Sequence, residues 1–182
     1  MITAAQLREM YPRCTAANAQ TFEIPISDAM REFMVDTPVR RAAFLGQVGH
    51  ESGQLHYVRE IWGPTDWQRK YEGNVLLGND QPGDGRRFLG RGLIQVTGRA
   101  NYRTCSHALY QDGQALLNNP ERLEEPMQAS RSAGWYWQSH GLNELADRNN
   151  YERITKRINV GMLGYAERVQ CWIDAKRVLG VH

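Results

Sequence analysis

The hydrophobic positions of this chain recur mainly at helical spacing, and one run is apolar on almost every side. Between residues 42 and 49 only Gln47 is polar, and a helix with so little polar surface is normally buried. Thr37 can cap the start of this helix, Pro38 suits its first position, and Gly53 marks its end. We therefore expect a central, buried helix in this part of the chain.

Further helices are predicted on both sides of the central one. A capping box formed by Thr3 and Gln6 begins a short first helix. Residues 15–25 are expected to form a connection, after which Ser27 caps a second helix. Helical spacing returns in the second half of the chain, over residues 100–109, 126–140, 150–158 and 165–179.

The segment between these two helical parts has a different pattern. Residues 55–62 show no clean helical period, and the chain from Gly63-Pro64 to Gly98 is rich in glycine and turn residues. The run Gln-Pro-Gly-Asp-Gly at 81–85 is a strong turn signal. The apolar run 93–96 is the best strand candidate of the chain. We predict a small β-containing lobe here.

Composition narrows the class of protein. A chain of 182 residues without repeats or low-complexity segments suits a single domain over residues 1–182, with no appended binding module. The net charge of +2 is small, but arginines gather in segments 86–103 and 148–168, which would favour an anionic polymer over a neutral one. We expect no nucleic-acid partner.

The cysteines and the N-terminal residues indicate in which cellular compartment the protein folds. Cys14, Cys105 and Cys171 are odd in number and far apart, so they predict neither a disulfide framework nor a thiolate zinc site. The first residues lack a basic stretch followed by a long apolar one, and no window reaches the length of a membrane-spanning helix. We expect folding in a reducing compartment, no export signal and no stable membrane association.

Carboxylates are the candidates for chemistry. Glu51 ends the apolar helix, where burial and the negative helix end both disfavour a charged carboxylate, as a general acid requires. His50 does not indicate zinc, because the residue four positions later is Gln54 rather than a second histidine. We therefore expect no metal and no other cofactor.

Glu60 is the second candidate carboxylate. A continuous helix would put Glu51 and Glu60 on opposite faces, but a break at Gly53 would let the chain fold back. The two groups could then lie about 6.5–9.5 Å apart, as in an inverting glycosidase. On spacing alone Glu60 could also be a surface carboxylate near Arg59, and Glu72 is the fallback candidate.

Three segments together resemble the signature blocks of family 19 glycoside hydrolases, which include chitinases and phage endolysins. They are His-Glu-Ser-Gly at 50–53, Gly-Arg-Gly-Leu-Ile-Gln-Val-Thr-Gly-Arg-Ala-Asn-Tyr at 90–102, and Ile-Asn-Val-Gly at 158–161 with Glu-Arg at 167–168. The resemblance runs in the same order over residues 30–175. It implies a mainly α, lysozyme-like fold of two lobes, with the small β region beside an active-site cleft.

The resemblance also implies a role for individual residues. Glu51 matches the general acid, Glu60 the general base, and Thr97 a residue that helps to hold the attacking water. The matching substrate-binding positions are Gln95, Asn101 and Tyr102, which line the cleft, and Asn159 and Arg168, which bind sugar or buttress the acid.

Aromatic residues near Glu60 add candidate sugar contacts independently of the resemblance. Trp62, Trp67 and Tyr71 could stack on sugar faces, although such residues are also common in cores. Of these, Trp62 is our substrate-binding candidate.

The chain has neither an export signal nor the disulfide cysteines of the family's chitinases, and in this it is similar to the phage endolysin branch. We therefore expect a monomeric endolysin that hydrolyses β-1,4 bonds of peptidoglycan, is made in the host cytoplasm and reaches the wall through a separate factor. Two alternatives stay open, a chitinase and an inactive wall-binding module. The second would not need Glu51 and Glu60 together.

Overall fold

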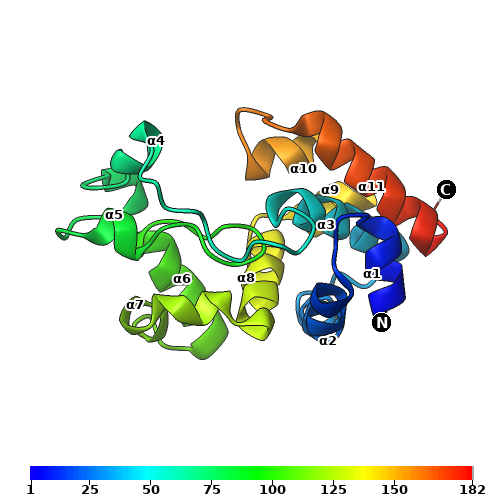
Figure 1. Ribbon diagram of the computed structural model, residues 1–182, viewed down its shortest axis with the longest axis horizontal. Helices are drawn as coiled ribbons and strands as arrows, with labels where there is room; N and C mark the ends of the chain where they lie inside the picture. The colour runs from blue at the N-terminus through cyan, green and yellow to red at the C-terminus, as the bar shows by residue number, and fades with distance from the viewer. Residues whose placement is uncertain (182) are drawn as a thin grey trace.

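The structure, a computed structural model, describes residues 1–181 and is mainly helical (Figure 1), which confirms the predicted fold class. The larger lobe contains α1 (Ala4–Met10), α2 (Ala16–Glu32), α3 (Pro38–Glu51), α8 (Pro126–Ser139), α9 (Leu142–Asp147), α10 (Tyr151–Ile158) and α11 (Tyr165–Leu179). The smaller lobe contains α4 (Asp66–Arg69), the 3-10 helix η1 (Val75–Leu77), α5 (Asp84–Arg87), α6 (Arg99–Tyr110), α7 (Ala115–Asn118) and the 3-10 helix η2 (Pro120–Glu124).

Helix α3 is the predicted central helix. The Thr37 side chain accepts a hydrogen bond from the backbone of Arg40, Pro38 occupies the first turn, and residues 42–49 are all buried. Helix α11 packs along α3 so closely that a Cβ added at Gly46 would lie 2.9 Å from Cα of Trp172. The expectation of a buried helix approached by another element is confirmed.

The predicted connection over residues 15–25 is wrong. These residues belong to α2, whose N-cap is Thr15 and which continues through Pro25, while Ser27 lies inside the helix and accepts a hydrogen bond from the Ile2 backbone at 3.0 Å. A proline within a helix removes one hydrogen bond, but packing of α2 against α8 outweighs that cost. The apolar residues of α2 recur at helical spacing and carried the missed signal, namely Ala19, Phe22, Ile26, Ala29 and Met30.

The predicted strand at residues 93–96 is also wrong. Arg91 and Val96 exchange two backbone hydrogen bonds, of 3.1 and 2.7 Å, and residues 92–95 form the turn between them. Gly92 and Gln95 have positive φ angles, which an extended strand does not allow. Within residues 1–181 the β content is limited to isolated bridges, so the small β region is replaced by a ribbon-like loop.

Two apolar clusters support the two lobes. The larger one is centred on α3, and the smaller one gathers residues of α6, α7 and η2 with Phe88 and Val96. The smaller lobe is also held by Asp84, whose carboxylate accepts a hydrogen bond from Arg99 Nε at 2.7 Å. Burial alone would raise the pKa of Asp84, but the bonds from Arg99 hold it below its ordinary value.

Two further properties of residues 1–181 bear on the predictions. The three cysteines are buried and free, and burial raises the pKa of the Cys105 thiol to about 12. No helix in this part of the chain combines the length and the apolar character needed to cross a membrane.

Candidate active site

Glu51 is held at the end of α3 by an ion pair. Its Oε1 lies 2.6 Å from Nη2 of Arg168 on α11. The Arg168 side chain is 2% exposed and the Glu51 side chain 16%, so the pair is largely desolvated, with the carboxylate as its accessible end. The buried helix α3 therefore ends on a carboxylate that reaches the surface, and the buried guanidinium of Arg168 fixes its orientation.

The guanidinium of Arg168 is itself held by two further groups. Its Nη1 donates to Gln47 Oε1 at 2.6 Å, and its Nε donates to the backbone oxygen of Leu163 at 3.2 Å. Gln47 in turn donates through Nε2 to Thr155 Oγ1 at 2.8 Å. Glu51 is thus the outer end of a hydrogen-bonded chain that joins α3, α10 and α11.

His50 precedes Glu51 and packs under the loop between α10 and α11. Its ring lies so close to Gly164 that a Cβ added at this glycine would overlap it. Burial lowers the pKa of His50, and the neighbouring Arg168 lowers it further. Residues 1–181 hold no group of three or more His, Cys, Asp or Glu side chains that could bind a metal ion.

Glu60 lies on the ribbon-like loop of the smaller lobe in a different environment. Its carboxylate accepts hydrogen bonds from Gln68 Nε2 at 2.9 Å, Tyr71 OH at 3.3 Å and the Gly90 backbone at 3.1 Å. Burial raises the pKa of Tyr71, and the charge of Glu60 adds to this effect, so the hydroxyl remains a donor. Neutral donors hold Glu60, whereas a cation holds Glu51.

Gly90 connects Glu60 to two other predicted site residues. The Glu60 backbone N–H donates to the Gly90 oxygen at 2.8 Å. A Cβ added at Gly90 would lie 2.5 Å from Gln95 Oε1 and 3.2 Å from Thr97 Oγ1. The structure therefore brings Glu60, Gln95 and Thr97 around one backbone position, and only glycine leaves room for them.

A cavity of about 240 Å³ lies between the two lobes at α8 and includes Gln95, Thr97 and Asn101. Its other walls are Leu77, Ile94, Val96, Trp135, Tyr136 and His140. The rings of Tyr136 and His140 stack at 3.8 Å between centroids. Burial raises the pKa of Tyr136, and the charge of Glu51 raises it further.

Tyr102 does not line this cavity, so its predicted substrate contact is wrong. Its side chain is fully buried, donates to the Leu89 oxygen at 2.7 Å and accepts from Arg91 at 3.0 Å. Tyr102 lies on α6 one position after Asn101, and successive helix positions point in different directions. Asn101 is exposed toward the cavity, whereas Tyr102 faces the smaller core.

The remaining predicted residues are not among those that line this cavity, and they differ in exposure. Asn159 caps the C-terminus of α10 and is partly exposed. Trp62 is partly buried with its ring 6.3 Å from that of Tyr71, and Trp67 is 66% exposed. Arg168 is buried behind Glu51, which leaves buttressing the acid as the role that its position permits.

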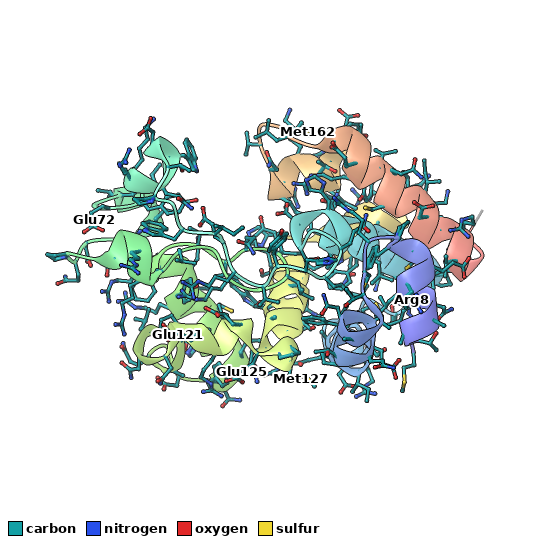
Figure 2. The ribbon with its side chains drawn as sticks, in the orientation of Figure 1. Arg8, Glu72, Glu121, Glu125, Met127 and Met162 are labelled. Carbon is teal, nitrogen blue, oxygen red and sulfur yellow. The ribbon has the colours of Figure 1, made fainter. Side chains whose placement is uncertain are left out.

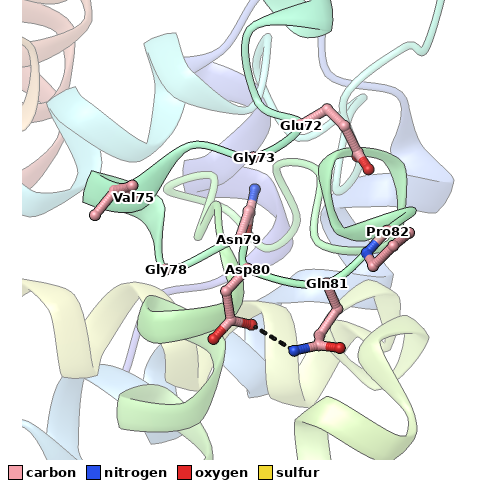
Figure 3. Close-up of a pocket in the computed structure, with 8 residues that line it drawn as sticks. All are labelled: Glu72, Gly73, Val75, Gly78, Asn79, Asp80, Gln81 and Pro82. Atoms are coloured by element: carbon pink, nitrogen blue, oxygen red, sulfur yellow. Dashed lines mark hydrogen bonds between the residues drawn. The ribbon is translucent and has the colours of Figure 1, made fainter.

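Glu72, the fallback base, borders a hollow of the smaller lobe. Figure 3 shows this hollow of about 570 Å³, which is lined by Glu72, Gly73, Val75, Gly78, Asn79, Asp80, Gln81 and Pro82. Both oxygens of Glu72 accept backbone hydrogen bonds, from Gly83 at 2.6 Å and Gly85 at 2.8 Å. Figure 2 places Glu72 on the smaller lobe and Met162 in the loop between α10 and α11 on the other. Glu72 holds the loop before α5.

Sequence reasoning missed Gln68, Trp135, Tyr136 and His140 as site residues. Gln68 is buried, and besides its bond to Glu60 it donates to the Ile61 oxygen at 2.8 Å. The Trp-Tyr-Trp run at 135–137 was a usable signal, because consecutive aromatics on one helix cannot all face the core. Only Trp137 of the three is fully buried.

Comparison with known proteins gives a consistent result. A family model described as chitinase class I matches residues 12–149. A glycosyl hydrolase family 19 domain-containing protein of Haemophilus influenzae is 29% identical, and the match covers 94% of each chain. Endochitinase CHI of Arabidopsis thaliana is 32% identical over 53% of this chain, which spans about a third (34%) of that relative's length.

Solved structures show the same fold. A bacterial family 19 chitinase matches over 100% of this chain and 96% of its own, with a TM-score of 0.76 and 23% identity. Chitinase C of Streptomyces griseus HUT6037 matches over 98% of this chain and 76% of its own, with a TM-score of 0.75 and 23% identity.

Proposed function

The chain belongs to glycosyl hydrolase family 19, the class I chitinase family, and on this premise we propose that it hydrolyses β-1,4 bonds of bacterial peptidoglycan with inversion. The observation that supports an inverting mechanism is that Glu51 and Glu60 lie in different environments. Glu51 pairs with a buried cation, while Glu60 accepts hydrogen bonds from three neutral donors beside Thr97. Different environments suit two carboxylates to different roles.

In the proposed reaction Glu51 begins protonated and gives its proton to the leaving glycosidic oxygen. Glu60 accepts a proton from a water molecule that Thr97 helps to hold, and the water oxygen attacks the anomeric carbon from the opposite face. The bond to the leaving oxygen breaks as the bond to water forms. Arg168 stabilises the Glu51 carboxylate that remains, because the two groups are already paired.

Basic residues near the loop of Glu60 support an anionic substrate. A pocket of about 340 Å³ is lined by Arg59, Gly83, Arg86, Arg87, Leu89, Arg91 and Glu121. Arg91 is committed to Glu124, with Nε 2.7 Å from the carboxylate. Arg59 lies 3.9 Å from the same carboxylate but is exposed, as is Arg86. Peptidoglycan carries lactyl and peptide carboxylates, whereas chitin is neutral. We further propose the endolysin setting, with synthesis in the host cytoplasm and release to the wall by a separate factor.

Chitin is the second candidate substrate, because the plant relatives and the solved bacterial structures bear the name chitinase. An inactive wall-binding module is less consistent with the arrangement. Such a module would gain nothing from an acid held by a buried arginine and a second carboxylate held beside Thr97.

The test combines two substrates with one variant. Clearing of permeabilised cells and hydrolysis of a chitin hexamer are measured for the wild type, for Glu51→Gln and for Glu152→Gln, a matched change at an exposed position of α10. We expect faster cleavage of peptidoglycan and a loss of about 10²–10⁴-fold in Glu51→Gln alone, since an amide cannot donate the proton. A folded Glu51→Gln variant that keeps more than about a tenth of wild-type activity would contradict the role of Glu51, and equal turnover of the two substrates would favour chitin.

A further inference from the structure

The hydrogen-bonded chain behind Glu51 begins at two side chains that never reach the surface. Gln47 and Thr155 are both 0% exposed, and Arg168 is 2% exposed. They lie on three different helices, α3, α10 and α11. Neither Gln47 nor Thr155 can touch a substrate, yet they are joined to the proposed acid through one guanidinium.

The geometry allows a single arrangement of the Gln47 amide. Its oxygen must face Arg168, because a guanidinium has only donors, and its nitrogen then donates to the hydroxyl of Thr155. The guanidinium is planar, so fixing Nη1 on Gln47 and Nε on the Leu163 oxygen also fixes Nη2, which holds Glu51.

We propose that Gln47, oriented by Thr155, is a positioning residue that acts through Arg168 to hold Glu51 where its proton can meet the leaving oxygen. The inference rests on the proposed role of Glu51 as the acid. A displacement of a reacting group by about 1 Å can cost about 100-fold in rate, so a residue that never touches substrate can still control turnover.

A purely structural role for Gln47 has a different energetic expectation. Gln47→Leu would then lower stability without a specific loss of kcat, because it leaves the buried Nη1 of Arg168 and the hydroxyl of Thr155 without their hydrogen-bond partner. The matched control is Asn143, a second buried amide of the larger lobe. It accepts from Trp137 Nε1 at 2.9 Å and donates to the Phe33 oxygen at 3.1 Å, away from Glu51.

The first experiment compares Gln47→Leu, Thr155→Val and Asn143→Leu on whichever soluble oligosaccharide the wild type cleaves. We expect Gln47→Leu to lower kcat by about 10-fold or more with KM changed by less than about two-fold, and Thr155→Val to lower kcat less. Asn143→Leu should lose stability but keep kcat. Equal losses of kcat in Gln47→Leu and Asn143→Leu would overturn the proposal. If Gln47→Leu does not fold, an unchanged kcat in Thr155→Val would overturn it instead.

A pH profile provides a readout that packing alone would not move. Gln47→Glu keeps the shape of the side chain but places a negative charge beside the Arg168 guanidinium. This charge partly offsets the positive charge that faces Glu51. We therefore expect the alkaline limb of kcat to move to higher pH, because a second negative charge nearby disfavours the ionised form of a carboxylate. The other titratable groups around this pair are unchanged in the variant, namely His50, Tyr136, Tyr151, Glu167 and Cys171.

An unmoved alkaline limb in Gln47→Glu would overturn the positioning role. Failure of the proposed function is distinguishable, because it appears as an active Glu51→Gln variant. An inactive Glu51→Gln together with normal kcat in Gln47→Leu and Thr155→Val would reject only the positioning role of Gln47.

Discussion

At the scale of single residues, the two candidate carboxylates differ in what holds them. Glu51 is bound by the buried cation Arg168, and Glu60 by an amide, a hydroxyl and a backbone N–H. Both sets of bonds include a charged carboxylate, but only the Arg168–Glu51 pair joins two charges, and this pair is largely desolvated. The Glu51 side chain should therefore be the more rigidly placed of the two, and the Glu60 side chain the more able to move.

Substitution of Glu60 separates it from the fallback base. We expect Glu60→Gln to lower kcat by about 10²-fold or more, because the amide cannot take a proton from water. Its nitrogen also replaces an accepting oxygen, so the hydrogen bond from Gly90 or those from Gln68 and Tyr71 are lost. Glu72→Gln should instead lower the unfolding midpoint and keep most of the activity, since Glu72 holds the Gly83 and Gly85 backbone. Steady-state kinetics and urea unfolding of both variants check this, and the reverse pattern would make Glu72 the base.

The stereochemistry of the product tests the same assignment without a mutation. If Glu60 activates water, a β-linked substrate should release the α-anomer first, because attack comes from the face opposite the leaving group. Early-time proton NMR of the reducing ends measures this directly. An initial excess of the β-anomer would show a retaining mechanism and remove Glu60 from the role of base.

At the scale of elements, the site depends on how closely α11 approaches α3. Gly46 lies at their contact, and the Arg168 that holds Glu51 is carried by α11. Any change in the distance between these helices therefore moves the cation relative to the carboxylate.

Gly46→Ala tests this contact. Helix propensity alone would favour alanine by about 1 kcal/mol. The added Cβ would lie 2.9 Å from the Trp172 backbone, however, and overpacking of a core typically costs about 1–3 kcal/mol. Since backbone cannot move aside cheaply, we expect net destabilisation and lower kcat, measured by urea unfolding and by kinetics. A variant more stable than the wild type would mean that α3 and α11 can separate freely.

At the scale of the whole molecule, the distribution of charge matters more than its sum. The net charge is only +2, and several arginines are committed to internal partners, as Arg168 is to Glu51 and Arg99 is to Asp84. The predicted steering therefore depends on the exposed arginines beside the Glu60 loop rather than on all basic residues of the two segments.

We expect the rate on cell walls to fall between low and moderate salt while the rate on a neutral oligomer changes little, because exposed charges are largely screened beyond about 8–10 Å at physiological ionic strength. The double variant Arg59→Gln/Arg86→Gln should weaken this salt dependence. Arg8→Gln/Arg31→Gln, which removes two exposed arginines from α1 and α2, is the control of equal charge. A salt-independent wall rate in the wild type would show that the arginines do not steer substrate.

The sequence by itself determined the features that depend on near neighbours in the chain. Helix α3, its Thr37 cap and the placement of Glu51 in its last turn follow from apolar spacing and capping chemistry, and α10 and α11 were predicted to within a residue. The family blocks also carried the correct fold class. Local sequence patterns predict a helix correctly where helix propensity and the burial of its apolar side chains favour the same structure.

Only the tertiary structure decided the features that depend on distant partners. Residues 15–25 are helical because α2 packs on α8, and residues 92–95 form a turn whose Gly92 and Leu93 N–H groups donate to the backbone oxygens of Val58 and Ala129. Nothing local indicates that Gln47 meets Arg168, 121 positions away, or that Tyr102 points into the smaller core while Asn101 faces the cavity. Such contacts form when the lobes pack, and the free energy of burying and pairing polar groups then selects among arrangements that the local sequence leaves open.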